Sequence, residues 1–200
     1  EASHASDLAG ECHRLLERRN LTPRQLAGVA VGTGPGSFTG LRVAAALALG
    51  LERAAGVPLH GISSMTAAAL NADRAKGLHL FLLDARAGRA YVALHDDADL
   101  PRALAPPEAP RLEDFHTWLA ERRIDGPLTV HADPSTLALS RGGPSLASTL
   151  SVLHPEHRTA PAPHPTAAAI LRLATDPEAP ASRCPPGTLR PLYLSRFGSH

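Results

Sequence analysis

The sequence predicts an α/β protein organised in two lobes, and three observations lead to this prediction. Helix-forming and strand-forming patterns alternate up to about residue 77. A β-hairpin pattern then opens the remainder of the chain, which indicates a change of architecture. The 200 residues, 44% of them hydrophobic, are enough for one sizeable core or two small ones.

The chain begins with an amphipathic helix predicted over residues 3–19. Its apolar side chains recur at steps of three and four residues, with charged side chains between them. These apolar residues are Leu8, Cys12, Leu15 and Leu16. Thr22 and Pro23 then supply an N-cap and a first helical position for a short turn of helix, and the apolar run 27–31 predicts a buried strand.

A tight glycine loop joins this strand to a second helix, predicted over residues 39–55 and stopped by Gly56. A short strand over 59–62 and a third helix beginning at Ser63 or Ser64 follow. Two strands are few for an α/β layer that must bury helices on its faces. We therefore expect a missing N-terminal segment to supply further strands, with strands donated by the C-terminal tail as the alternative.

The second part of the chain opens with the strands of the hairpin, residues 78–83 and 91–94. Gly88 occupies the turn position that needs a positive φ. Further along, the pattern predicts a helix near 112–122, a strand near 128–131 and a helix over 166–174. A short extended piece covers 191–194.

Composition and charge limit the functions that the chain can have. The 20 basic and 19 acidic residues give a formal net charge of +1, so nucleic acid would be met locally or through a partner. Arg18, Arg19, Arg24, Arg122 and Arg123 are the candidates for local phosphate contact. The 11 histidines show no helical ligand pair, so we interpret them mostly as solvated surface residues and expect no metal site.

The expected location is the cytoplasm. The two cysteines, Cys12 and Cys184, belong to no C-x-x-C pair, which is typical of a reducing compartment. No apolar stretch approaches the roughly 20 residues of a membrane helix, and the first residues lack the pattern of a signal peptide.

The glycine loop places backbone N–H groups at a helix start, which is a general anion-binding geometry. It matches none of the standard phosphate or nucleophile motifs. Leu41 and Arg42 stand where Walker A needs Lys and Ser or Thr, Thr39 stands where a dinucleotide fingerprint needs Gly or Ala, and Ser37 lacks the flanking glycines of a nucleophile elbow. A purely structural interpretation is that the glycines permit a sharp turn, that Thr39 caps the helix and that Phe38 packs under it.

The segment GTGPGSFTGLRVAAALALGLERAAGVPLHGISSM resembles the core of the bacterial TsaB (YeaZ) family. The similarity extends to a D-A-R-x-G-x-x-Y hairpin beginning at Asp84, to the Pro-Thr-Ala-Ala-Ala helix near residue 167 and to the tail 191–194. The signature residues of the loop are Gly34, Pro35, Gly36, Ser37, Phe38, Thr39, Gly40 and Arg42. The N-terminal strand pair of the family, which opens with L-A-I-D-T, has no counterpart in this sequence.

The resemblance implies the two-lobed actin-like, sugar-kinase and Hsp70 ATPase (ASKHA, ribonuclease H-like) fold. The first lobe would comprise residues 1–77 and about 189–200, and the second lobe residues 78–188. In the related catalytic subunit TsaD, a His-x-x-x-His metal pair follows the second strand, whereas this chain has Ser64 and Ala68 at the two ligand positions. The resemblance thus implies a subunit without catalytic residues of its own.

The same resemblance implies the partners TsaD and the ATPase TsaE in threonylcarbamoylation of adenosine 37, in tRNAs that read ANN codons. The tRNA would be met through the complex, and ATP or ADP would bind only at a shared interface. We expect the faces of the first two helices to contact TsaD, or a second copy of the chain when TsaD is absent. The contact residues are Leu8, Cys12, Leu15, Leu16, Val43, Leu47 and Leu51.

Two alternatives stay open at the level of the sequence. The apolar rows on both helices could instead face the protein's own sheet. The chain could also be an enzyme of the same superfamily, either a small-molecule kinase or a glycoprotease-like peptidase. A kinase of this fold needs an early phosphate-binding hairpin, and a peptidase needs a nucleophile with a base or a metal; neither pattern is found.

Overall fold

The computed structural model describes residues 7–192 apart from 74, 123, 125, 180 and 181. Its contacts group the chain into two compact units. Unit 1 comprises Glu1–Ser64 and Ala167–Tyr193, and unit 2 contains Met65–Thr166. The unit boundaries therefore fall at residues 64 and 167. The lobe boundaries predicted from the sequence were near residues 77 and 189.

Unit 1 is built on a βαβ arrangement. Strand β1 (Val29–Gly34) pairs in parallel with β2 (Leu59–Ser63), and helix α2 (Phe38–Ala55) connects them. Both strands and the helix were predicted, although β1 continues three residues past the expected end. Gly56 adopts the left-handed conformation with φ of 71°, which ends α2 where the sequence placed the stop.

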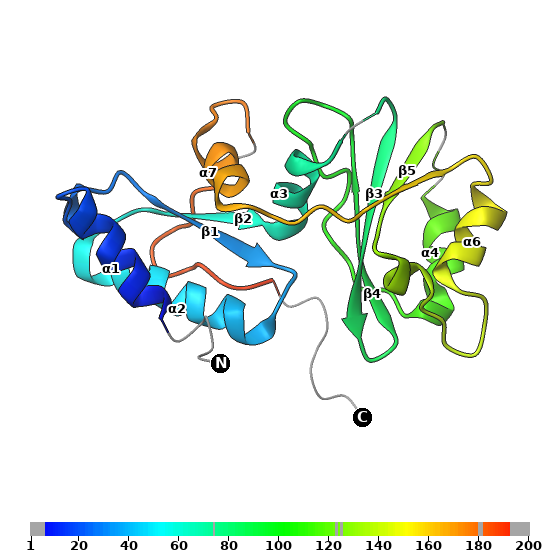
Figure 1. Cartoon of the computed structure of the whole chain (residues 1–200), viewed down its shortest axis with the longest axis horizontal. Helices are drawn as coiled ribbons and strands as arrows, with labels where there is room; N and C mark the ends of the chain where they lie inside the picture. The colour runs from blue at the N-terminus through cyan, green and yellow to red at the C-terminus, as the bar shows by residue number, and fades with distance from the viewer. Residues whose placement is uncertain (1–6, 74, 123, 125, 180–181, 193–200) are drawn as a thin grey trace. The chain divides into compact units, whose positions relative to one another are not determined.

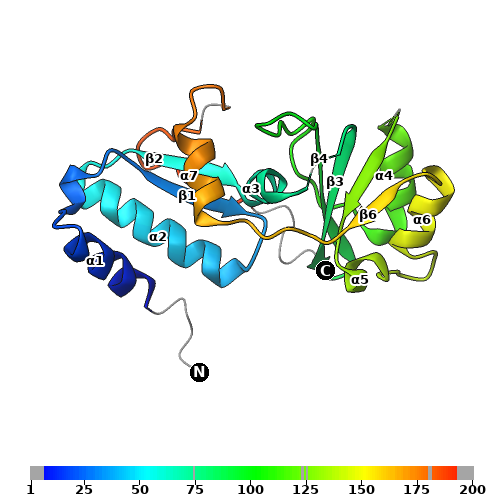
Figure 2. The same cartoon turned by 45° about the horizontal axis from the view of Figure 1, so that its top comes forward.

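Helices α2 and α7 (Ala167–Thr175) cover opposite faces of this sheet, and both lie against it in Figures 1 and 2. Val31 and Leu59 pack on one face against Ala45 and Ala48 of α2. Gly32 follows Val31 in β1, so its Cα hydrogen points to the other face of the sheet. A Cβ added there would lie 3.2 Å from Ile170 of α7. The predicted helix 166–174 thus belongs to unit 1, whereas the sequence analysis assigned it to the second lobe.

The C-terminal segment returns to the same sheet and supplies part of what the two strands lack. Arg183 forms an antiparallel bridge with His60 on β2, and the Leu192 N–H donates a 2.7 Å hydrogen bond to the Thr33 carbonyl of β1. Leu189 is 4% exposed and completes the cluster around Val31 and Leu59. The C-terminal segment therefore adds backbone hydrogen bonds to β1 and β2, but among the described residues it forms no further strand of the kind that the alternative interpretation expected.

The N-terminal helix is confirmed as α1 (Leu8–Arg18), and a short 3₁₀ turn, η1 (Pro23–Gln25), follows it. Thr22 and Gln25 form a capping box at this turn. No residue of α1 is buried, and in both views the helix lies beside α2 (Figures 1 and 2). The apolar face of α1 is consequently held by few contacts within unit 1.

Unit 2 contains a four-stranded mixed sheet in the order β4-β3-β5-β6. The predicted hairpin forms as β3 (Leu78–Arg86) and β4 (Arg89–His95), and β5 (Leu128–His131) pairs in parallel with β3. Strand β6 (Arg158–Ala160) was not predicted, and it adds in parallel to β5. Its three residues are too few to show an alternating pattern.

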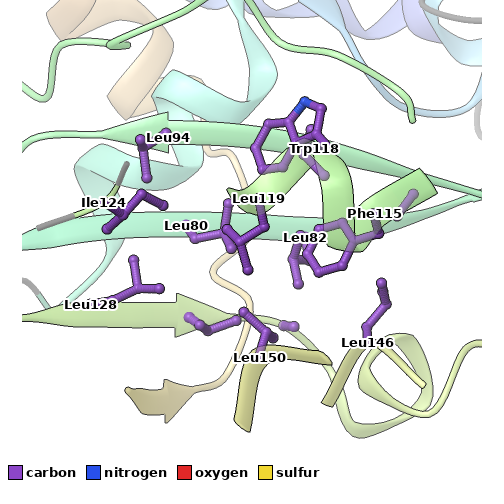
Figure 3. Packing of buried hydrophobic residues seen from close by; sticks show 14 residues of the cluster. Leu80, Leu82, Leu94, Phe115, Trp118, Leu119, Ile124, Leu128, Leu146 and Leu150 are labelled. Carbon is purple, nitrogen blue, oxygen red and sulfur yellow. The ribbon is translucent and has the colours of Figure 1, made fainter. Parts of the chain in front are cut away.

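One face of this sheet carries the larger core. Leu80, Leu82 and Val130 point toward helices α4 (Phe115–Glu121) and α6 (Leu146–Leu153), as Figure 3 shows for the leucines. The short 3₁₀ turn η2 (Leu112–Asp114) leads into α4, and the one-turn helix α5 (Pro134–Leu137) precedes α6. The sequence analysis missed α5 and α6; α6 has the serines and threonines that favour turns, and its helix start depends on the Ser145 cap.

The opposite face of the unit 2 sheet carries a smaller cluster under helix α3 (Ser64–Asn71), in which Met65 and Ala69 pack against Phe81 and Ala93. None of the helices in the described part of the chain has the length and apolar character of a membrane span.

Candidate functional site

The glycine loop lies at the end of β1 and turns directly into α2. The Gly34–Pro35 peptide is cis, and Gly34 has a φ of 101°. A Cβ on Gly34 would lie 2.8 Å from Leu41 Cδ1, so this position needs glycine for its backbone and for its space. Gly36 has no atom within 4 Å of such a Cβ and lies at the open tip of the loop.

Ser37, and not Thr39, is the N-cap of α2. Its Oγ accepts a hydrogen bond of 3.3 Å from the Gly40 N–H, and the helix begins at Phe38. The expectation that Thr39 caps the helix was therefore wrong by two residues. The Gly40 N–H is therefore already bonded to the Ser37 hydroxyl and is not free to donate to an anion.

Phe38 and Arg42 form a pair on the outer surface of the first helical turn. The Phe38 side chain does not pack beneath the helix, because it is 42% exposed. The guanidinium carbon of Arg42 lies 5.2 Å from the centre of its ring, within the range of a cation–π contact. The signature residues of the loop thus present one aromatic ring and one cation outward.

Ser64 ties the end of β2 to the loop. Its Oγ accepts a 3.1 Å hydrogen bond from the Gly34 N–H, and it lies 3.3 Å from the position of a Cβ on Gly32. Ala68 is 7% exposed. The family resemblance implied these two positions for the counterparts of the TsaD metal pair, and here the Ser64 hydroxyl bonds the loop backbone. Among the described residues, no group of three or more His, Cys, Asp or Glu side chains could hold a metal ion.

Helix α2 carries two apolar faces, and only one of them is used by the sheet. Ala45 and Ala48 are buried against β1 and β2, and Ala44 and Leu49 flank them. The predicted contact row lies on the other side of the helix, at positions four residues apart. Its members, Val43, Leu47 and Leu51, are half-buried and do not belong to the sheet cluster.

The predicted contact residues of α1 are accessible to different degrees. Leu8, Cys12 and Leu16 are half-buried, whereas Leu15 is 58% exposed. The α2 row is thus outside the cluster that packs on the sheet, and the partner of both rows stays a prediction.

A buried histidine network in unit 2 was not predicted. His79, His95 and His131 are 0–1% exposed, so the interpretation of the histidines as solvated is wrong for these three. His79 Nδ1 lies 2.9 Å from His131 Nε2, and His79 Nε2 lies 3.0 Å from the Ala75 carbonyl oxygen. Their positions inside apolar strands could have indicated burial, because alternate residues of β3 point to one face.

Burial changes the protonation of these imidazoles. Desolvation lowers the pKa of His95 to about 4, opposed by the charge of Asp96. Desolvation also lowers the pKa of His131 to about 4, and repulsion from His79 adds to this effect. His95 Nε2 bonds Thr66 Oγ1 at 3.1 Å, while His95 Nδ1 is buried with no hydrogen-bond partner in the described structure. Both rings are therefore neutral at pH 7.

A cavity of about 740 Å³ opens in unit 2, at the amino ends of β3, β5 and β6. Lys76, His154 and Arg158 are among its lining residues. Ligands of open α/β sheets bind at the carboxyl ends of the strands, so its position does not favour an active site. The glycine loop in unit 1 is not part of this cavity.

Comparison with known proteins identifies the class and then the family. Two solved structures of Pseudomonas aeruginosa, one titled YeaZ and one described as similar to peptidase YEAZ, superpose with TM-scores of 0.70 and 0.69. They cover 96% and 97% of this chain and 85% of their own, at 19% identity, which establishes the fold. The class is the actin-like (ASKHA) α/β fold.

Residues 1–101 match the family model described as TsaD, tRNA N6-adenosine threonylcarbamoyltransferase. The chain belongs to this family and, within it, to the TsaB (YeaZ) group. It is 32% identical over 111 residues to the tRNA threonylcarbamoyladenosine biosynthesis protein TsaB of Bacillus subtilis, covering 55% of this chain and 48% of that protein. The protein of the same name in Haemophilus influenzae is 35% identical over 103 residues, covering 46% and 43%. The chain thus spans about half the length of the curated relatives it matches.

Proposed function

We propose that this chain is a non-catalytic subunit in the synthesis of threonylcarbamoyladenosine at position 37 of tRNA, acting with TsaD and TsaE. The family assignment supports the pathway, since relatives are named for the biosynthesis of this nucleoside. The observation that carries the role is the second apolar face of α2, which the chain's own sheet does not cover. Large side chains on such a face contribute about 1.5–3 kcal/mol each when a partner buries them.

The non-catalytic role is supported by the residues at the loop and after β2. Ser37 is used as a helix cap and Ser64 as an acceptor for the Gly34 N–H, so each hydroxyl already has a structural task. In the described structure the hydrogen bonds of these two hydroxyls are made to backbone N–H groups, and not to a base of the kind that an activated nucleophile requires.

The partner contact is tested by placing a charge in the row of α2 that lies outside the sheet cluster. We expect Leu47→Arg to abolish binding to TsaD in calorimetry, because a guanidinium would be buried in an apolar contact. Ala46→Arg is the matched control, since Ala46 is exposed on the same helix and outside the row. Full affinity of the Leu47→Arg chain for TsaD would contradict the proposed contact.

The same variants address self-association and catalysis. Without TsaD, the wild-type chain is expected to form a dimer in gel filtration, and Leu47→Arg a monomer. Nucleoside mass spectrometry is expected to show threonylcarbamoyladenosine only when TsaD, TsaE, ATP and the threonylcarbamoyl donor accompany the chain. ATP hydrolysis or peptide cleavage by the purified chain alone would support the alternative, an enzyme of the same superfamily.

A further inference from the structure

An arginine row crosses the turn of the β3–β4 hairpin in unit 2. Arg86 at the end of β3 is paired with Arg89 at the start of β4, and Arg89 is paired on its other side with Arg111. Three neighbouring chain segments therefore each place an arginine at the same level, with adjacent backbones about 4.8 Å apart.

The pairing between Arg89 and Arg111 brings like charges close together. The Ala90 N–H bonds the Pro110 carbonyl at 3.2 Å, and the Leu112 N–H bonds the Gly88 carbonyl at 2.9 Å. These bonds flank the two arginines, which makes them a non-hydrogen-bonded antiparallel pair, the type in which side chains approach most closely. Like charges directly opposite each other are unfavourable in a sheet, and here Arg89 donates to the Ala109 carbonyl while Arg111 pairs with Glu113.

A fourth arginine joins the row from a distant part of the sequence. The Arg141 guanidinium donates a 3.2 Å hydrogen bond to the Ala87 carbonyl, and a Cβ on Gly88 would lie 2.5 Å from it. The turn that it contacts is itself strained, because Arg86 and Ala87 have positive φ values of 61° and 49°. The hairpin turn is thus held in an unfavourable backbone conformation beneath a cluster of cations.

Only part of this charge is compensated. Asp84 pairs with Arg86 at 3.3 Å and Glu113 with Arg111 at 3.2 Å. In the described part of the chain, Arg89 and Arg141 have no carboxylate within ion-pair distance, and each donates a hydrogen bond to a backbone carbonyl. Arg86, Arg111 and Arg141 are exposed, so their guanidinium groups can reach an external anion.

We propose that the arginine row of Arg86, Arg89, Arg111 and Arg141 binds the phosphate backbone of tRNA. The inference rests on the proposed function, which assigns a tRNA substrate to the complex. The row carries four cations against the two carboxylates of Asp84 and Glu113, so it concentrates positive charge at one turn of a chain whose net charge is +1. Arginine is suited to this contact because its planar fork donates two parallel hydrogen bonds to a phosphate.

The sequence analysis named other arginines for this role. Arg122 is half-buried and stacks on Trp118, with its guanidinium carbon 3.8 Å from the ring centre, whereas Arg86, Arg111 and Arg141 are exposed. Arg123 lies outside the described residues. Arg18, Arg19 and Arg24 are exposed in unit 1, without the mutual pairing seen in unit 2.

The test measures binding of an unmodified tRNA transcript to the 200-residue chain by fluorescence anisotropy, from about 50 to about 200 mM salt. Arg111→Gln and Arg141→Gln are each expected to weaken binding and to reduce the salt dependence by one phosphate contact, which lowers the affinity ratio across this range about threefold. Arg172→Gln on α7 removes one exposed charge from unit 1 and is the control. An equal loss in the control, or no loss at Arg111 and Arg141, would overturn the inference.

Thermal melting supplies a second readout. Arg111→Gln removes the 3.2 Å ion pair with Glu113 as well as the like-charge pairing with Arg89. Its melting temperature therefore checks that a loss of tRNA binding is not a loss of folding. Poly-glutamate is added as a competitor of the bound tRNA. If it displaces the tRNA as effectively, per charge, as unlabelled tRNA does, the ligand of the arginine row is not specifically RNA. Formation of threonylcarbamoyladenosine in the reconstituted complex tests the proposed function separately. If the wild-type chain supports this reaction and both arginine variants bind tRNA as the wild type does, the arginine inference is wrong and the proposed function still holds.

Discussion

At the scale of single residues, Gly34 explains why the loop signature begins with glycine. Its φ of 101° is a conformation that L side chains rarely adopt, and Leu41 Cδ1 occupies the space of a Cβ. Gly36, two residues later, has open space around it. Only Pro35 separates these two glycines in the motif, but they have different roles in the structure.

Gly34→Ala is therefore expected to destabilise the protein by about 1–3 kcal/mol, through backbone strain and the contact with Leu41. The measurement is urea unfolding followed by circular dichroism. Gly36→Ala serves as the control and should change the free energy of unfolding by less than about 0.5 kcal/mol. Equal effects of the two substitutions would show that the position of Gly34 is not special.

The buried histidines make the stability of unit 2 depend on pH. In the unfolded chain His95 and His131 bind protons below about pH 6.5, whereas in the folded chain they stay neutral down to about pH 4. The unfolded state thus binds more protons between these values. The stabilising contribution is complete above pH 6.5 and is lost as the pH falls toward 4.

We expect the free energy of unfolding to fall by about 3 kcal/mol for each of the two histidines between pH 6.5 and 4. Urea titrations at several pH values measure this slope. His95→Gln should reduce the slope, and substitution of the exposed His116 should leave it unchanged. A wild-type stability that does not vary across this range would contradict the assignment of neutral imidazoles.

At the scale of secondary-structure elements, α6 shows how one helix separates core from surface. Leu150 is 0% exposed in the cluster between the sheet and α4 (Figure 3), whereas Val152, two residues later, is 73% exposed. Residues two apart on a helix point in different directions, so one apolar residue is buried and the other is not.

Leu150→Ala should cost about 2–5 kcal/mol of stability, the usual loss when a buried leucine leaves a cavity. Val152→Ala, on the same helix, should change stability by no more than about 0.5 kcal/mol. Thermal unfolding of the two variants makes the comparison. A small effect of Leu150→Ala would mean that the core around α4 and α6 collapses to fill the space.

At the scale of the whole molecule, the chain divides into two units, and the first of them is assembled from two distant segments. Unit 1 gains α7 and the C-terminal segment from residues beyond 166, and Leu189 completes its core. Unit 2 is continuous from Met65 to Thr166. Each unit has its own hydrophobic cluster, so substitutions such as Leu150→Ala and Gly34→Ala act on separate cores.

The sequence alone determined the fold class, the βαβ arrangement around the glycine loop, the β3–β4 hairpin and the family. These features depend on local patterns: periodicity, helix stops and a motif of fixed spacing. It also located the apolar row Val43, Leu47 and Leu51, because residues four apart share a helix face.

Only the tertiary structure decided which face of α2 meets the sheet, where α7 packs, that three histidines are buried and that four arginines meet at one turn. Each of these depends on contacts between residues far apart in the chain, such as Arg89 with Arg111 and His79 with His131. Spacing along a sequence carries no record of such pairings, since burial and charge proximity arise only when strands and loops are brought together.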